Sequence, residues 1–250
     1  MKRYTDQVVC VTGAGRGIGR AVAERFAQEG ADLILISNEE KDLLEAEADL
    51  RQTGCRTFAC VTDVSDPEQV DQAVARALDK FGKIDVLINN AGIAWEEDFL
   101  DISASNWNKI IDVNLNGMFY VAQRVSRQMA EQGGGVIVNM ASTNGLVGEE
   151  KYAHYNASKG GVVLLTKTMA LELGAKNIRV NAVCPGYIRT PMSDAIDSPE
   201  FVAEYIRQRI PLGRAGTMKD VAGVFAFLAS EDAAFIHGEM IVVDGGQLAM

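Results

Sequence analysis

Short apolar runs alternate with longer amphipathic stretches along the whole chain, and this alternation limits the possible folds more than any other feature. The apolar runs are rich in Val and Ile and almost unbroken, which is typical of strands buried on both faces. We expect strands at residues 8–11, 33–36, 57–61, 86–88, 136–138, 180–183 and 240–243. The stretches between them have helical periodicity, and we expect helices at residues 18–28, 40–51, 67–81, 106–129, 156–173 and 218–229.

This repeated alternation predicts an α/β fold, because neighbouring parallel strands must be joined by crossovers, which are usually helical. We therefore expect a doubly wound parallel sheet of seven strands with helices on both faces. No linker or internal repeat divides the 250 residues, so we expect one domain over residues 1–250. Residues 187–211 are the longest region without a clear pattern. They follow the sixth expected strand, where ligands of such sheets bind, so they form a candidate substrate-lid loop.

The overall charge excludes several classes of partner. The formal net charge is −10 at pH 7, which disfavours binding to nucleic acid or to an anionic membrane. No apolar run approaches the ~18 residues of a membrane span. The chain has two histidines and no C-x-x-C pair, so we expect no metal site and only free thiols in a cytoplasmic protein. The four cysteines are Cys10, Cys55, Cys60 and Cys184.

A glycine-rich turn follows the first expected strand. Residues 12–19 read TGAGRGIG and lead directly into a helix, with glycines at Gly13, Gly17 and Gly19. A strand, a glycine-rich turn and a helix in this order place backbone N–H groups and the positive end of the helix beneath a pyrophosphate. The turn therefore predicts a Rossmann-type dinucleotide site.

Further motifs follow in a fixed order: Asp63-Val64, Asn89-Asn90-Ala91-Gly92, Asn114, Ser142, Tyr155-x-x-x-Lys159, and Pro185-Gly186 leading to Thr190. With the glycine turn, these make the chain resemble the compact form of the short-chain dehydrogenase/reductase family, about 250 residues long, over essentially its full length. The resemblance implies an oxidoreductase that moves a hydride between NAD(P) and a carbonyl or secondary alcohol.

The resemblance also implies which residues bind the cofactor. The turn, with Gly13, Arg16, Gly17, Ile18 and Gly19, would hold the pyrophosphate. Asp63 would bond to the adenine amine and Val64 would pack beside the ring. Asn90, Ala91 and Gly92 would let the backbone approach the ribose, and Ile188 and Thr190 would contact the nicotinamide carboxamide.

Tyr155 and Lys159 are four residues apart in a helical pattern, so their side chains lie on one helix face. A nearby ammonium stabilises a phenolate, so we expect Lys159 to lower the pKa of Tyr155 from about 10 and make it the proton-transfer group. The resemblance implies that Ser142 orients the substrate oxygen, Lys159 bridges to the ribose hydroxyls, and Asn114 supports a water link from Lys159. His154, beside the tyrosine, is expected at the surface or in a subunit contact.

The choice between NAD and NADP depends on the end of the second expected strand, where an acidic residue would bind the ribose hydroxyls of NAD. Ser37 stands there, followed by Asn38, and Arg16 could reach a 2′-phosphate. These residues favour NADP slightly. Glu39 and Glu40 follow immediately and oppose it.

The substrate is expected to be a free small molecule, with a sugar, a polyol or a related ketone favoured. The residues expected beside it are Trp95, Asn144, Leu146, Tyr187 and Met192. One alternative is a 3-oxoacyl-thioester reductase, for which Arg124 and Arg127 could supply part of a basic docking surface, although the net charge opposes an acidic carrier. Another is a nucleotide-binding regulatory protein without catalysis. The resemblance implies a homotetramer built on the helices at 106–129 and 156–173 and on the C-terminal segment.

Overall fold

The computed structural model describes residues 2–249. Within that range, seven parallel strands form one sheet in the order β3-β2-β1-β4-β5-β6-β9. Their bounds are β1 (Val8–Thr12), β2 (Asp32–Ser37), β3 (Thr57–Val61), β4 (Val86–Asn89), β5 (Gly135–Met140), β6 (Ile178–Pro185) and β9 (Met240–Val243). This confirms the predicted doubly wound sheet, and every predicted strand lies within an observed one.

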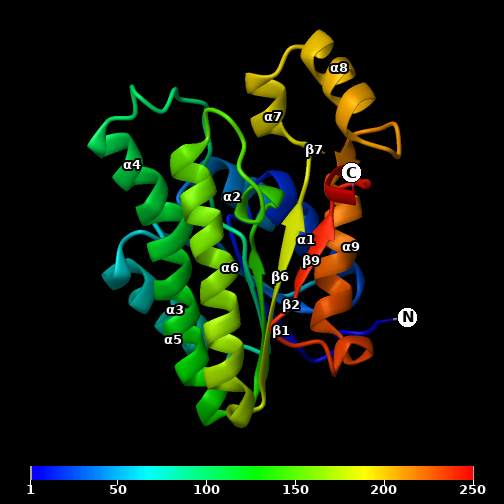
Figure 1. Cartoon of the computed structure of the whole chain (residues 1–250). Helices are drawn as coiled ribbons and strands as arrows, with labels where there is room; N and C mark the ends of the chain where they lie inside the picture. The colour runs from blue at the N-terminus through cyan, green and yellow to red at the C-terminus, as the bar shows by residue number, and fades with distance from the viewer. Residues whose placement is uncertain (1, 250) are drawn as a thin grey trace.

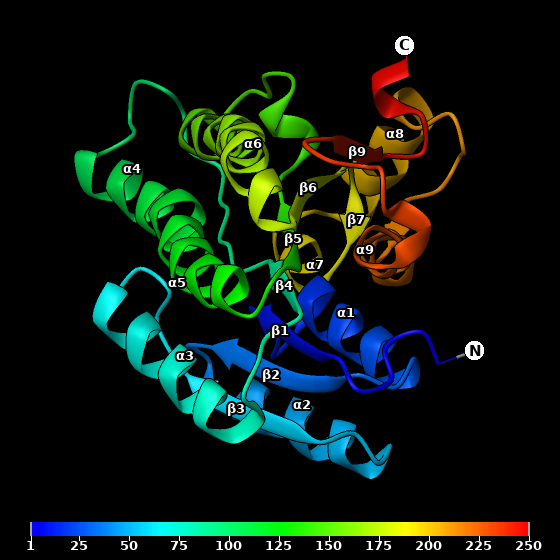
Figure 2. The same cartoon turned by 90° about the horizontal axis from the view of Figure 1, so that it is seen from below.

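Helices cover both faces of this sheet (Figures 1 and 2). One face carries α1 (Gly17–Gln28), α2 (Glu40–Gln52) and α9 (Met218–Ala229), and the other carries α3 (Pro67–Phe81), α5 (Met118–Glu131) and α6 (Ala153–Leu173). Strand side chains point alternately to the two faces. In β1, Val9 and Val11 therefore join the first core, while Val8 and Cys10 join the second.

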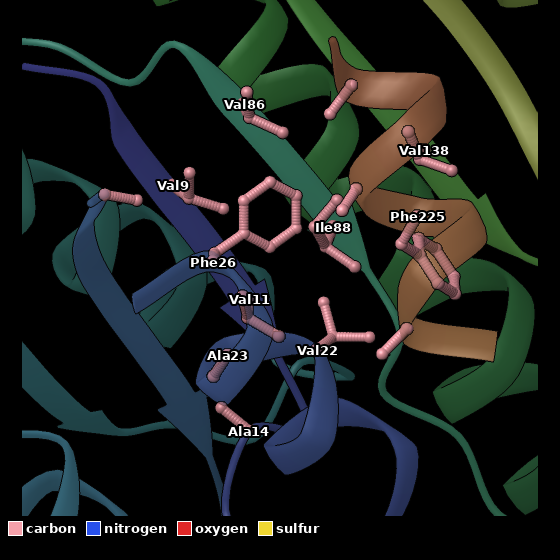
Figure 3. Packing of buried hydrophobic residues seen from close by; sticks show 14 of the residues in the cluster. Val9, Val11, Ala14, Val22, Ala23, Phe26, Val86, Ile88, Val138 and Phe225 are labelled. Atoms are coloured by element: carbon pink, nitrogen blue, oxygen red, sulfur yellow. The ribbon is translucent and has the colours of Figure 1, made fainter. Parts of the chain in front are cut away.

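Two aromatic side chains fix α1 and α9 to the sheet. Phe26 of α1 lies over Val9, Val86 and Ile88, and Phe225 of α9 lies near Val138 (Figure 3). Both phenylalanines are fully buried, and each such burial stabilises the fold by roughly 2–3 kcal/mol. The packing fixes α1 rigidly, so that its N-terminus stays at the carboxyl end of β1.

The long helix predicted at residues 106–129 is divided. It consists of α4 (Ala104–Ile111), a π-helical segment η1 (Asp112–Gly117) and α5. Each π turn widens the helix by one residue and often occurs at functional positions. Here the widened turn contains Asn114, whose side chain is fully buried.

Residues 187–211 are not a loop, so that prediction is wrong. They contain β7 (Ile188–Arg189), α7 (Pro191–Ile196) and α8 (Pro199–Arg209), and β7 pairs with β8 (Gly216–Thr217). Thr190 and Ser198 cap the two helices, and each is followed by a proline in the first turn. Both helices lie beyond the carboxyl ends of the central strands (Figure 1).

Short 3₁₀ turns complete the secondary structure: η2 (Thr143–Gly145), η3 (Gly174–Lys176), η4 (Glu231–Ala233) and η5 (Gln247–Ala249). α6 ends at Leu173 as predicted, although the left-handed residue that follows is Asn177, with φ of 58°, and not Gly174. Across residues 2–249, none of the helices combines the length and the apolar character that crossing a bilayer requires.

Candidate active site

A cleft of about 580 Å³ opens at the carboxyl ends of the strands, where β1 and β4 lie side by side and the strand order reverses. Ligands of open α/β sheets bind at such a point. Every residue predicted to bind the cofactor or to take part in catalysis lines this cleft, except Asn114. These lining residues are Gly13, Arg16, Gly17, Ile18, Gly19, Ser37, Asp63, Val64, Asn90, Ala91, Gly92, Ser142, Tyr155, Lys159, Ile188 and Thr190.

The glycine turn combines a left-handed residue, a conformation that favours glycine, with a close backbone contact that leaves no room for a side chain. Gly17 has φ of +59°, and a Cβ on Gly19 would lie 2.1 Å from the carbonyl oxygen of Gly13. α1 starts at Gly17, and its N-cap Arg16 makes no side-chain cap within the described chain, so the first-turn amides face the cleft. A close-approach turn with open helix amides fits the pyrophosphate of a dinucleotide.

The end of β4 is tied to this turn by hydrogen bonds. The Asn90 side chain donates to the carbonyl oxygen of Thr12 at 2.9 Å, and the Thr12 hydroxyl accepts from the backbone N–H groups of Asn90 and Ala91, both at 2.9 Å. Asn90 lines the cleft as predicted, and its side chain braces the glycine turn. This contact, and the supporting role of Thr12, are not predicted from the sequence.

The outer part of the nucleotide side contains Ser37, Asp63 and Arg16. The Ser37 hydroxyl accepts from the backbone N–H of Glu39 at 3.2 Å. One carboxylate oxygen of Asp63 accepts from the backbone N–H and the hydroxyl of Ser65, at 2.9 and 2.7 Å. Arg16 is largely exposed, with a guanidinium nitrogen 3.9 Å from Asp42, so it lies within reach of a phosphate at the cleft edge.

Tyr155 and Ser142 meet at the centre of the cleft. Ser142 follows β5, is 8% exposed, and accepts from the backbone N–H of Asn144 at 3.1 Å. Burial raises the pKa of Tyr155 to about 12, while a hydrogen bond from Ser142 lowers it and the negative Glu149 raises it. The direction is opposite to the one predicted from the sequence, because burial removes the hydration that would stabilise the phenolate.

Lys159 is almost completely buried one helical turn from Tyr155. Its ammonium donates to the carbonyl oxygen of Met140 at 2.7 Å and lies 5.7 Å from the centre of the Tyr155 ring. Burial lowers the pKa of Lys159 to about 8. The amine is therefore hydrogen-bonded to the end of β5 and lies near the ring of Tyr155, which explains why it does not lower the pKa of the phenol.

Asn114 lies behind the cleft and not in its wall. Its side chain accepts from the backbone N–H of Ile93 at 2.8 Å and donates to the Ile93 carbonyl at 2.9 Å and to the Ser158 hydroxyl at 3.2 Å. Asn114 thereby joins the loop after β4 to α6. Gly92 lies between Asn114 and the Lys159 ammonium, since a Cβ there would be 3.2 Å from the amide oxygen and 3.7 Å from the amine.

On the nicotinamide side, Ile188 is buried in β7 and Thr190 caps α7. The Thr190 hydroxyl accepts from the backbone N–H of Ser193 at 3.2 Å. Both residues belong to the segment that passes over the cleft, so they connect the nucleotide side of the cleft to α7 and α8.

The substrate side differs from the prediction in several residues. Asn144 and Tyr187 line the cleft as expected, Trp95 and Leu146 do not, and the Met192 side chain lies outside the described residues. Several lining residues are not among those predicted, including Tyr152, Phe201, Tyr205, Glu149 and Asp197. Those from 197 onward belong to the end of α7 and to α8, helices that were not predicted.

His154 is fully buried, so its expected place at the surface is wrong. The edge of the Trp95 ring packs on the imidazole, with ring centres 5.3 Å apart. Trp95 thus faces the interior and not the substrate.

The chain is similar to known proteins over nearly its whole length. A family model described as Enoyl-(Acyl carrier protein) reductase matches residues 13–247. The 3-oxoacyl-[acyl-carrier-protein] reductase of Thermotoga maritima is 43% identical, with 98% of both chains covered. The meso-2,3-butanediol dehydrogenase of Serratia marcescens is 39% identical, with 99% of this chain and 96% of that enzyme covered. The crystal structure of levodione reductase matches with a TM-score of 0.95 at 38% identity, covering 99% of both chains.

Proposed function

Since this chain belongs to the short-chain dehydrogenase/reductase family and is an NAD(P)-dependent oxidoreductase, we propose that Tyr155 exchanges the proton with the carbonyl or alcohol of its substrate. The bound nicotinamide supplies or accepts the hydride. The observation that carries the proposal is the place of Tyr155, which lines the same cleft as the glycine turn and Ser142.

The raised pKa of Tyr155 decides which form of the residue acts first. With a pKa of about 12, the phenol keeps its proton at neutral pH. A protonated phenol donates to a carbonyl oxygen as negative charge develops there, which is the reduction direction. Ser142 bonds to the same oxygen and orients it, while Lys159 provides a fixed positive charge below its pKa of about 8.

The test of this proposal is a Tyr155→Phe variant. Phenylalanine keeps the ring and its packing but has no proton to transfer. We expect unchanged nucleotide binding and a fall in kcat of at least ~100-fold, which is the usual contribution of a positioned acid. Wild-type turnover in this variant would refute the assignment. Retained nucleotide binding with no turnover in the wild-type chain would instead support a regulatory protein.

For the cofactor, we propose NADP, supported by the serine hydroxyl at the end of β2 and by Arg16 at the cleft edge. Glu39 also lines the cleft and acts against a 2′-phosphate. Measurement of kcat/KM with NAD and NADP side by side decides the preference.

For the substrate, we propose a sugar, a polyol or a related small ketone. The outer cleft combines tyrosine rings with the carboxylates of Glu149 and Asp197, which accept hydrogen bonds from hydroxyl groups and repel anions. Residues 187–211 act as the lid in this proposal. A panel of alcohols and ketones, scored by absorbance of the reduced nicotinamide, tests it.

A 3-oxoacyl-thioester is the second candidate substrate. It is favoured by the 43% identity to the 3-oxoacyl-[acyl-carrier-protein] reductase of Thermotoga maritima. A docking surface for an acidic carrier would need Arg124 and Arg127, and Arg124 lies 3.5 Å from Asp71, which neutralises part of its charge. A 3-oxoacyl thioester in the same panel distinguishes the two.

We also propose a cytoplasmic homotetramer. All four cysteines of the described chain are free thiols, which fits a reducing compartment. Large apolar side chains are exposed on the helices expected at subunit contacts, including Leu171 of α6 (87% exposed) and Phe119 of α5 (41%). Light scattering of the purified protein gives the oligomeric state.

A further inference from the structure

Within residues 2–249, the N-terminus of α6, like those of α1 and α2, lacks the side-chain cap that several other helices of this chain have. In α3, α4, α8 and α9, a side-chain oxygen of the N-cap residue accepts from a first-turn amide. The N-cap residue of α6 is Tyr152, which makes no such bond to the described residues. First-turn amides left without partners destabilise a helix end. Because α6 carries both Tyr155 and Lys159, the way in which this end is held matters for the site.

His154 supplies the missing acceptor. Its Nδ1 accepts from the backbone N–H of Tyr155 at 2.9 Å, and its side chain is fully buried. A nitrogen that accepts a hydrogen bond carries no proton, so the neutral ring has its hydrogen on Nε2. Burial lowers the pKa of His154, which agrees with a neutral ring at pH 7.

The other side of the imidazole faces a fixed carboxylate. Nε2 lies 3.7 Å from an oxygen of Glu97 and has no hydrogen-bond partner among residues 2–249. That carboxylate accepts from the Trp95 indole at 3.1 Å and from the Asn106 amide at 3.0 Å. The backbone N–H of Glu97 donates to the carbonyl of Lys151 at 2.9 Å. The loop after β4 is thus held against the start of α6 on both sides of His154.

We propose that His154 is a positioning residue for Tyr155: its Nδ1 holds the backbone of the tyrosine, and Glu97 and Trp95 of the loop after β4 hold the ring in place. The inference rests on the proposed role of Tyr155. His154 does not line the cleft, so it acts only through its neighbour. A shift of the reacting group by ~1 Å can cost about 100-fold in rate, so loss of this hydrogen bond affects kcat more than nucleotide binding.

Three variants separate the two ring nitrogens. In His154→Asn, the amide oxygen takes the place of Nδ1 and keeps the acceptor. In His154→Gln, the amide nitrogen takes the place of Nε2 and the acceptor is lost. His154→Phe keeps the aromatic packing on Trp95 and loses both. The measurements are kcat, KM for the nucleotide, and amide hydrogen exchange at Tyr155.

We expect kcat to fall ~10-fold or more in the Phe and Gln variants and exchange at the Tyr155 amide to accelerate, with KM for the nucleotide within about 2-fold of wild type. The Asn variant should keep kcat within about 3-fold and retain the slow exchange. An Asn variant as impaired as the Phe variant, or a Phe variant with wild-type kcat, would overturn the inference. Tyr155→Phe in the same assay keeps the two claims apart: if it is inactive while His154→Phe is normal, only the role of His154 fails.

Discussion

Replacement of Lys159 by methionine is expected to make the protein more stable and nearly inactive. Lys159 is 2% exposed and its pKa is lowered from 10.5 to about 8 by burial. At about 1.4 kcal/mol per pH unit, this lowering corresponds to a cost of roughly 3 kcal/mol for keeping the lysine charged in the folded protein. Methionine of similar length removes the charge and fills the space.

Part of the stability gained by replacing Lys159 with methionine is lost again. The Met140 carbonyl, which accepts from Lys159 at 2.7 Å, loses its donor, and that costs about 1 kcal/mol. The net gain of roughly 2 kcal/mol corresponds to a rise in Tm of about 4–8 °C for a chain of this size. The turnover should fall by ~100-fold or more, since Tyr155 then lacks the fixed positive charge beside it.

The difference in stability between the wild type and Lys159→Met should depend on pH, because the folded and unfolded chains lose the Lys159 proton at different pH values. Below pH 8, the folded and unfolded chains both carry the proton on Lys159, so the cost is present in full. Between about pH 8 and 10.5 the folded amine is neutral while the unfolded one is still charged, so the wild type gains stability as the pH rises. The advantage of the Lys159→Met variant should therefore shrink towards pH 10.

Thermal unfolding of the wild type and two variants at pH 7 and pH 10 checks the prediction. Lys167→Met is the matched control, because Lys167 lies exposed on the same helix and should change neither Tm nor turnover. A lower Tm for Lys159→Met at pH 7, or an advantage that stays constant up to pH 10, would refute the reasoning.

Three further predictions concern the same cleft. Because the pKa of Tyr155 is about 12 and Lys159 keeps its charge below a pKa of about 8, carbonyl reduction should be independent of pH between 5 and 7, whereas alcohol oxidation should rise about tenfold per pH unit over the same range as the phenolate fraction grows; equal pH profiles in the two directions would contradict this. Gly19→Ala places a Cβ 2.1 Å from the Gly13 carbonyl oxygen and should raise KM for the nucleotide at least ~10-fold, while the control Gly148→Ala, whose Cβ meets nothing within 4 Å, should leave KM unchanged. Ser37→Asp puts a carboxylate at the end of β2 and should raise KM for NADP ~10-fold or more without raising that for NAD; an equal loss with both nucleotides would argue against a 2′-phosphate at this position.

The sheet, and the order of strands and helices along the chain, could be predicted from the sequence because the spacing of apolar residues and the local composition determine each element. Strands buried on both faces need continuous Val and Ile, and no other local pattern competes with that one. α8 is different, because none of its described residues is buried, although Phe201, Val202, Tyr205 and Ile206 follow helical spacing. Its N-terminal signal is Ser198 followed by Pro199, of the same kind as Asp66 followed by Pro67 at the start of α3.

The motif residues could be located from spacing, whereas the contacts of individual side chains could not. Asn90 follows β4 as expected, yet its amide braces Thr12, because the nearest free backbone carbonyl belongs to the neighbouring strand. In the sequence His154 lies between Ala153 and Tyr155, three residues after the exposed Lys151, and nothing in that pattern indicates full burial. Only the loop after β4, distant by more than 50 residues, provides the Trp95 and Glu97 that cover it.

The pKa values of Tyr155 and Lys159 depend on how deeply the two side chains are buried, and the spacing of the residues in the sequence does not show this burial. In water the two groups titrate close together, near pH 10 and 10.4, so the amine and the phenol could exchange a proton at little cost. In the cleft, burial raises one pKa to about 12 and lowers the other to about 8, because a low dielectric penalises both charged forms. The proton is therefore held firmly on the phenol, the residue that lines the cleft, and the lysine cannot remove it. A carbonyl oxygen that gains negative charge can, so at neutral pH the phenol is in the form that acts as the acid in carbonyl reduction.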